Sequence, residues 1–195
     1  MSRSSPSMGG MIRGLLVFSG LILASMACQV NLGGPTRPGA PIQSSSQDAQ
    51  TLQDQWAGAL ALSAEQGDIS LKIDEAQLTS FVALRFQQKS ELGLENPQVY
   101  LRDGQIQFFA TLDRGILRAS ILMGIAPNVD SEGNLTFDVT SADFGPVPMP
   151  DVLKNSISSA ISEAFTGSIG PLATGIDIKS VDVSDGEMTL TGRFR

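Results

Sequence analysis

None of the 195 residues of this sequence is a histidine, so its acidic side chains are the main candidates for acid–base catalysis. Without histidine there is no Ser-His-Asp or Cys-His nucleophile pair, no His-ligated zinc site and no imidazole base. Two carboxylates could still hydrolyse a glycoside. The candidates are Asp113, Asp138, Asp143, Asp177, Asp182, Asp185 and Glu187. Strand periodicity places them at turns or on solvated strand faces, which favours a solvated surface over an active site.

Hydroxyl groups and a possible metal loop are weaker candidates. The serines Ser156, Ser158, Ser159 and Ser162 lie on a predicted helix without a base, and helical spacing favours solvent exposure for Lys154. The segment 128–134 places oxygen-bearing side chains at alternate positions, as a calcium loop does, but the position that needs a bidentate Glu is Val139. We therefore expect a turn between strands, no metal, no cofactor and no enzymatic activity.

The N-terminal 27 residues have the pattern of a signal peptide. Arg3 and Arg13 precede an apolar run at 14–27, which is shorter than the roughly 20 residues that a membrane-spanning helix needs. The single cysteine, Cys28, follows small residues directly, and this arrangement resembles the bacterial lipobox. The resemblance implies that Cys28 is acylated after cleavage, which would anchor the protein to the extracytoplasmic face of the membrane. Ordinary secretion and a retained signal anchor are the alternatives.

A tether and one domain follow. Residues 28–47 are rich in Gly, Pro and Ser and lack apolar periodicity, which predicts a flexible tether, and residues 48–195 contain no further linker. The isoelectric point near 4.5 and the formal charge of −7 argue against a nucleic-acid partner. With one cysteine, the domain forms no internal disulfide and depends on its apolar core.

Hydrophobic spacing predicts the elements of an α+β domain. A helix is expected at 48–66, a strand at 68–73, and a second helix that begins at Asp74, with Gln77 at the capping-box position. Alternating residues predict antiparallel strands between 97 and 140, with a hairpin turn at Asp103–Gly104, and a closing hairpin that begins at residue 175. A third helix is expected from Pro150 to Phe165. The simplest arrangement is a long curved antiparallel sheet wrapped around this third helix, with one or two helices before it.

The apolar stripes of the sheet and the third helix converge on a candidate ligand site. Small residues beside the stripes, such as Ala110, Ala119, Gly124 and Ala160, suggest an interior that is partly unfilled, although plain core packing explains the stripes as well. The predicted lining is Phe81, Phe108, Leu135, Phe137, Ile157, Ile161 and Phe165.

Three stretches of sequence resemble the YpmS-like group of bacterial envelope proteins. They are IDEAQLTSFVALRF (73–86), VYLRDGQIQFFATL (99–112) and EGNLTFDVTSADFGPVPMPDVL (132–153). The fold is also distantly similar to that of tubular lipid-binding proteins. The resemblance implies a fold for hydrophobic ligands at a membrane surface, and it brings no catalytic residues. The leading hypothesis is thus a non-catalytic envelope lipoprotein that binds a lipid or another apolar molecule. A structural module without a ligand and, less favoured, a glycan hydrolase are the alternatives.

Overall fold

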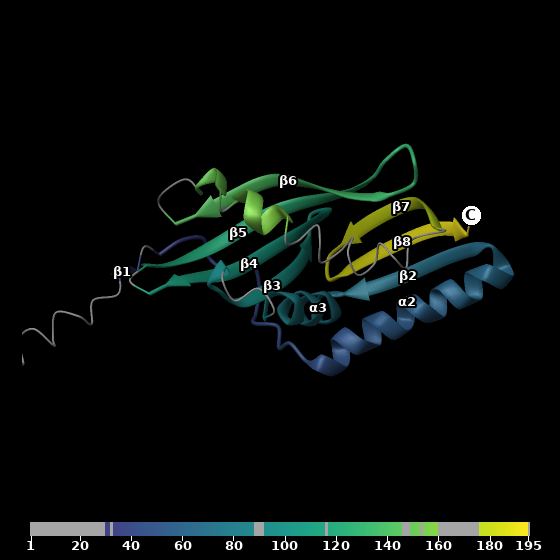
Figure 1. Ribbon diagram of the computed structural model, residues 1–195, viewed down its shortest axis with the longest axis horizontal. Helices are drawn as coiled ribbons and strands as arrows, with labels where there is room; N and C mark the ends of the chain where they lie inside the picture. The colour runs from purple at the N-terminus through teal and green to yellow at the C-terminus, as the bar shows by residue number, and fades with distance from the viewer. Residues whose placement is uncertain are drawn as a thin grey trace, which may run out of the picture. The chain divides into compact units, whose positions relative to one another are not determined.

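The computed structural model describes residues 30–31, 33–87, 92–115, 117–145, 149–152, 154–159 and 176–194. The chain divides into two units, residues 1–30 and 31–195, and every described residue except Val30 belongs to the second. This second unit is α+β, as the sequence predicted. Its described part combines the helices α2 (Ser46–Gln66) and α3 (Glu75–Gln87) with two antiparallel sheets (Figure 1).

Local capping starts both helices. The Oγ of Ser45 accepts a hydrogen bond from the Asp48 amide at 3.0 Å, one turn into α2. At α3 the predicted capping box is confirmed, since Asp74 Oδ1 accepts from the Gln77 amide at 2.8 Å and Gln77 Oε1 accepts from the Asp74 amide at 3.1 Å. These bonds satisfy amides that the first turn of a helix leaves without partners.

The larger sheet has the strand order β1-β5-β4-β3, and β6 also pairs with β5. Its strands are β1 (Val30–Asn31), β3 (Leu94–Arg102), β4 (Gln105–Arg114), β5 (Leu117–Val129) and β6 (Leu135–Phe144). The register sets Phe108 of β4 between Val99 of β3 and Met123 of β5, and all three are buried. The predicted apolar face of β4, from Ile106 to Leu112 at alternate positions, is therefore confirmed as part of the core.

The smaller sheet consists of β2 (Asp68–Asp74), β8 (Glu187–Phe194) and β7 (Ile176–Ser184), in that order. The turn between β5 and β6 lies against it, because the Gly133 carbonyl accepts a hydrogen bond from the Ile178 amide at 3.0 Å. A Cβ atom at Gly133 would lie 2.1 Å from Oδ1 of Asp177. Glycine also suits the positive φ of 77° at this position, which would strain a residue with a side chain.

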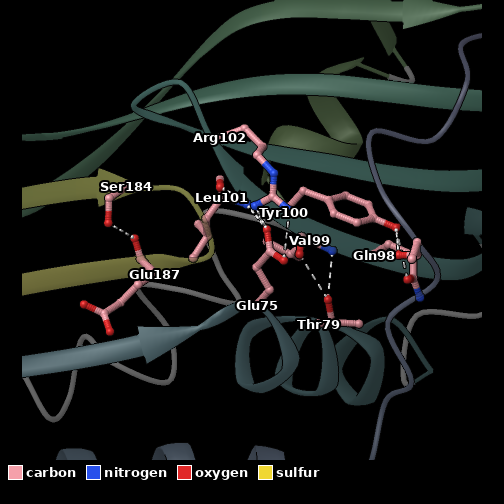
Figure 2. A network of polar contacts seen from close by, with 10 residues as sticks. Glu75, Thr79, Gln98, Val99, Tyr100, Leu101, Arg102, Ser184 and Glu187 are labelled. Carbon is pink, nitrogen blue, oxygen red and sulfur yellow. Dashed lines mark hydrogen bonds and ion pairs between the residues drawn. The ribbon is translucent and has the colours of Figure 1, made fainter.

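The free edge of β3 is bound by side chains of α3 (Figure 2). Thr79 Oγ1 accepts a hydrogen bond from the Val99 amide at 2.9 Å and donates one to the Val99 carbonyl at 3.3 Å. One turn earlier on α3, Glu75 accepts a hydrogen bond from the Leu101 amide at 2.7 Å and forms an ion pair with Arg102. Thr79 and Glu75 thus form the hydrogen bonds that a neighbouring strand would otherwise form with β3, and they protect its edge from pairing with another chain.

The second sheet reaches the same edge of β3. The Gly186 amide, in the turn between β7 and β8, donates a hydrogen bond to the Leu101 carbonyl at 2.9 Å. Figure 2 shows this hairpin beside the end of β3. The two sheets and α3 thus contribute to one continuous apolar core.

Two features differ from the expected architecture. The third helix is described only at 151–152 and 154–159, and a sheet wrapped around a long helix is not seen in the described residues. Side chains of α3 pack on the apolar face of the larger sheet, since the rings of Phe86 and Phe108 stack with centroids 5.4 Å apart. The second difference is that residues 33–45, expected to be part of a flexible tether, lie against the larger sheet. We call these residues the strap.

Candidate functional site

The strap is held on the outer face of the larger sheet by hydrogen bonds to its backbone. The Ile42 amide donates to Gln98 Oε1 at 2.6 Å, and Gln98 Nε2 donates to the Ile42 carbonyl at 2.9 Å. The Tyr100 hydroxyl donates to the Ala40 carbonyl at 2.9 Å. Such bonds need no particular strap side chain, which explains why the composition of the strap did not predict docking.

The two ends of the strap are also attached. The Ser120 amide of β5 donates a hydrogen bond to the Gly33 carbonyl at 3.0 Å. At the other end, the Ser45 amide donates to Ser80 Oγ of α3 at 3.0 Å. The strap therefore runs from β5 across β3 to the start of α2.

A pocket of about 820 Å³ lies beside the strap. Its walls are the strap, the C-terminal end of α3, the first residues of β3 and the outer face of β4. The lining residues are Arg37, Pro41, Ile42, Gln43, Ser44, Ala83, Phe86, Gln87, Gly93, Leu94, Glu95, Asn96, Pro97, Gln98, Phe109, Thr111 and Asp113. The pocket thus offers both apolar and polar contacts to a bound molecule.

The pocket lies where β3 departs from regular pairing. The register with β4 shifts between Glu95 and Gln98, and Asn96 adopts a positive φ of 49°. Asparagine tolerates this conformation better than most residues, and Pro97 has no amide to donate. The bulge therefore comes from the local sequence.

Two aromatic side chains of the larger sheet, Phe109 and Tyr100, contact the strap. The guanidinium carbon of Arg37 lies 5.7 Å from the centre of the Phe109 ring, within the range of a cation–π interaction. Tyr100, two residues along β3 from Gln98, is buried under the strap. Burial raises the pKa of the Tyr100 hydroxyl above its ordinary value of 10, and the nearby Arg37 partly opposes that rise.

The two acidic residues of the pocket share one arginine. Arg118 Nη2 lies 3.2 Å from Oε2 of Glu95, and Arg118 Nη1 lies 3.6 Å from Oδ2 of Asp113. Among the described residues no carboxylate forms an ion pair with Arg37. The pocket therefore has one guanidinium whose charge is not matched by an acidic side chain of the described chain.

The predicted ligand residues lie elsewhere. Phe81, Phe108 and Ile157 are 3%, 1% and 0% exposed, and they belong to one packed core. Leu135 and Phe137 on β6 are half-buried against that core. None of these five lines the pocket. Ile161, Phe165 and the proposed lipid attachment site Cys28 lie outside the described residues.

One of the small residues that suggested an unfilled interior has a different role. Gly124 lies opposite Gln107 in the register, on the outer face of the sheet. A Cβ atom there would be 2.7 Å from Ser141 Oγ and 2.9 Å from Gln105 Oε1. Gly124 therefore marks close packing, not free space.

Sequence reasoning missed the residues of the pocket, although one signal for them exists. In β4 the outward positions carry Gln105, Gln107 and Thr111, and Phe109 interrupts this polar series. A buried aromatic residue on an otherwise polar face needs a cover, and here the cover includes the strap residue Arg37. Phe109 was thus the available indication that something packs on this face.

The other chemical candidates have structural roles in the described residues. Asp130 Oδ1 accepts hydrogen bonds from the amides of Glu132 and Asn134 at 2.8 and 2.9 Å, so it closes the expected turn between β5 and β6. Ser156 Oγ and Ser158 Oγ donate to the carbonyls four residues earlier in their own helix. In the described part of the chain no group of three His, Cys, Asp or Glu residues is arranged to hold a metal ion.

Of the predicted carboxylates, Asp113 lines the pocket, and the other six are found at the surface in the described structure. Glu187 forms an ion pair with Lys72 at 2.8 Å, Asp138 accepts from Asn128 Nδ2 at 2.8 Å, and Asp177 forms an ion pair with Lys179. The remaining ones, Asp143, Asp182 and Asp185, are exposed.

Comparisons with known proteins do not assign the chain to a family. No protein-family model matches the chain, and no curated protein matches it significantly. Within the residues that the structure describes, no helix is both long and apolar enough to cross a membrane.

Proposed function

We propose that the protein is a non-catalytic, membrane-tethered lipoprotein of the bacterial envelope, and that it binds a lipid or another hydrophobic ligand in the pocket beside the strap. The observation that carries the proposal is the pocket of about 820 Å³, which lies in the size range of small-molecule sites. Phe86, Phe109 and Leu94 supply apolar surface. Gln98 and Thr111 supply polar groups that could orient a ligand.

Acylation of Cys28 is the second part of the proposal. Its support is the N-terminal sequence, in which a short apolar run ends in small residues before the single cysteine. Each buried methylene contributes roughly 0.8 kcal/mol to membrane binding, so two or more acyl chains anchor a protein stably.

The proposal also includes a third helix that runs from Pro150 to Phe165, with the curved sheet wrapped around it. Their support is Ile157, which is fully buried in the core within the described helical residues. Such a helix would add to the core on the apolar face of the sheet, and none of its described residues lines the pocket.

Displacement of a fluorescent lipid from the full-length protein in detergent tests the binding function. The variant Thr111→Trp places a large ring in the pocket from the half-buried end of β4, and it should weaken lipid binding at least tenfold while the thermal midpoint stays within a few degrees. The matched control is Thr189→Trp, a half-buried strand threonine of β8 that does not line the pocket, and its binding should equal that of the wild type. If the wild type binds no fluorescent lipid, the binding function is refuted, and the protein is a structural module of an envelope assembly.

Membrane fractionation and mass spectrometry test the anchor. Cys28→Ser should either release the protein from membranes or leave the signal peptide uncleaved, and the wild type should carry the mass of acyl chains on its first residue. A Cys28→Ser protein that is processed and fractionates with membranes as the wild type does would show that another segment retains it.

A further inference from the structure

The strap contains one charged residue. Between residues 29 and 47 the only charged side chain is Arg37, in a chain with 13 basic and 20 acidic residues. Arg37 lines the pocket and its guanidinium lies over the Phe109 ring. Arg37 is the one cation among the described lining residues, and the two carboxylates of that lining, Glu95 and Asp113, are paired with Arg118.

Arg37 differs from the other described arginines that lie close to acids. Arg102 pairs with Glu75, Arg118 with Glu95 and Asp113, and Arg193 with Asp68, whereas the described residues provide no acidic partner for Arg37. The ring beneath it and the Tyr100 hydroxyl beside it keep the guanidinium over the pocket and do not neutralise it. The guanidinium donors that do not bond to the Tyr100 hydroxyl are available to an anion.

From this arrangement we propose that the ligand of the pocket is an amphiphile with an anionic head, and that Arg37 binds its phosphate or carboxylate group. The apolar part of the ligand lies against Phe109, Ile42 and Leu94, which line the same pocket. This inference rests on the binding function proposed above, and it adds the class of ligand and the residue that recognises its head.

The length of the N-terminal segment favours a membrane lipid as the source. Nine peptide units separate Cys28 from Arg37, and a fully extended chain of that length spans at most about 32 Å. With acyl chains on Cys28, Arg37 stays within reach of the lipid headgroups. The tether therefore keeps the pocket where the local concentration of anionic amphiphiles is highest.

Native mass spectrometry of the full-length protein, released from detergent micelles, tests the inference. The probes are phosphatidylglycerol and a long-chain fatty acid, with diacylglycerol as the uncharged analogue and inorganic phosphate as the head without a tail. The wild type should bind both anionic amphiphiles at least tenfold more tightly than diacylglycerol and phosphate. Arg37→Gln should weaken the anionic amphiphiles about tenfold, the effect of losing one charge-assisted hydrogen bond, and leave diacylglycerol unchanged.

Two further variants separate charge from structure. Arg37→Lys should keep part of the affinity, because it keeps the charge and loses the planar donor pair. Arg193→Gln removes an exposed arginine that is ion-paired with Asp68 outside the pocket, and it should change no affinity. The inference is wrong if diacylglycerol binds as tightly as phosphatidylglycerol, if Arg37→Gln binds like the wild type, or if phosphate alone binds as tightly as the lipids. The proposed function itself fails only if no amphiphile binds at all.

Discussion

Replacing Thr79 by valine tests whether α3 is held on the edge of β3 by its hydroxyl group. Thr79 is fully buried, and its Oγ1 satisfies both the amide and the carbonyl of Val99, at 2.9 and 3.3 Å. Valine has nearly the same shape and cannot make either bond. Both backbone groups would then lie buried without a partner, since Val99 is 1% exposed.

The size of the effect follows from these two contacts. A buried polar group without a partner costs about 1 to 3 kcal/mol, and the amide bond, which is the shorter one, should account for most of the loss. The additional methyl group of valine offsets part of it, by about 0.8 kcal/mol. We expect Thr79→Val to lower the free energy of unfolding by about 2 to 3 kcal/mol, which corresponds to about 4 to 12 °C in thermal midpoint for a domain of this size.

Thr79→Ser is the matched control, because it keeps the hydroxyl group and removes only the methyl group. Its expected cost is about 1 kcal/mol, from the lost methyl group and the small cavity that remains. Urea unfolding followed by the fluorescence of Trp56, the single tryptophan and a buried residue of α2, gives both values. A serine variant that is as unstable as the valine variant, or more so, would show that packing of the methyl group holds α3 and that the hydrogen bonds contribute little.

Three other substitutions or conditions probe α2 and the strap. Gly58→Ala should raise the free energy of unfolding by about 0.5 to 1 kcal/mol in urea titrations, because Gly58 is exposed in α2 and a Cβ there meets no atom within 4 Å; an unchanged or lower value would contradict the helical position. Gly34→Ala should loosen the strap and speed hydrogen exchange of residues 33–45, because its φ is +134° and its Cβ would lie 2.7 Å from the Ser120 carbonyl oxygen; exchange at the rate of the wild type would show that the strap does not need this approach. Tyr100 is the only tyrosine, so ultraviolet absorbance of the phenolate reports its pKa, which should lie above 10 in the folded protein. Because the folded pKa is raised above the unfolded value, the stability linked to Tyr100 is complete below about pH 10 and is lost as the pH rises through the folded pKa, together with the hydrogen bond to Ala40; a phenolate that appears at or below pH 10 would refute this.

The local sequence determined the helix starts and hairpins. Asp74 and Gln77 form the expected capping box because both residues lie within one turn of the helix that they start. Asp103 and Gly104 both adopt positive φ, at 53° and 73°, as the predicted two-residue turn requires. These features depend on interactions between neighbours in the chain, which the sequence displays directly.

Alternation along the strands also predicted which face is buried. Ile106, Phe108 and Leu112 face the core as expected, because a strand turns successive side chains to opposite faces. The same alternation did not show what lies on that face. The apolar stripe of the third helix was the expected partner, and its described residue Ile157 is buried in the same core, but the residue that stacks on Phe108 is Phe86 of α3.

The tertiary structure alone decided where the strap and the pocket lie. Nothing in the composition of residues 33–45 distinguishes a docked segment from a flexible one, because the strap is held through its own carbonyl and amide groups by Gln98 and Tyr100 of a distant strand. The pocket depends in turn on the strap, on the end of α3 and on the bulge in β3. Local patterns describe contacts within a few residues, whereas a site formed by segments far apart in the chain exists only once their surfaces have been brought together.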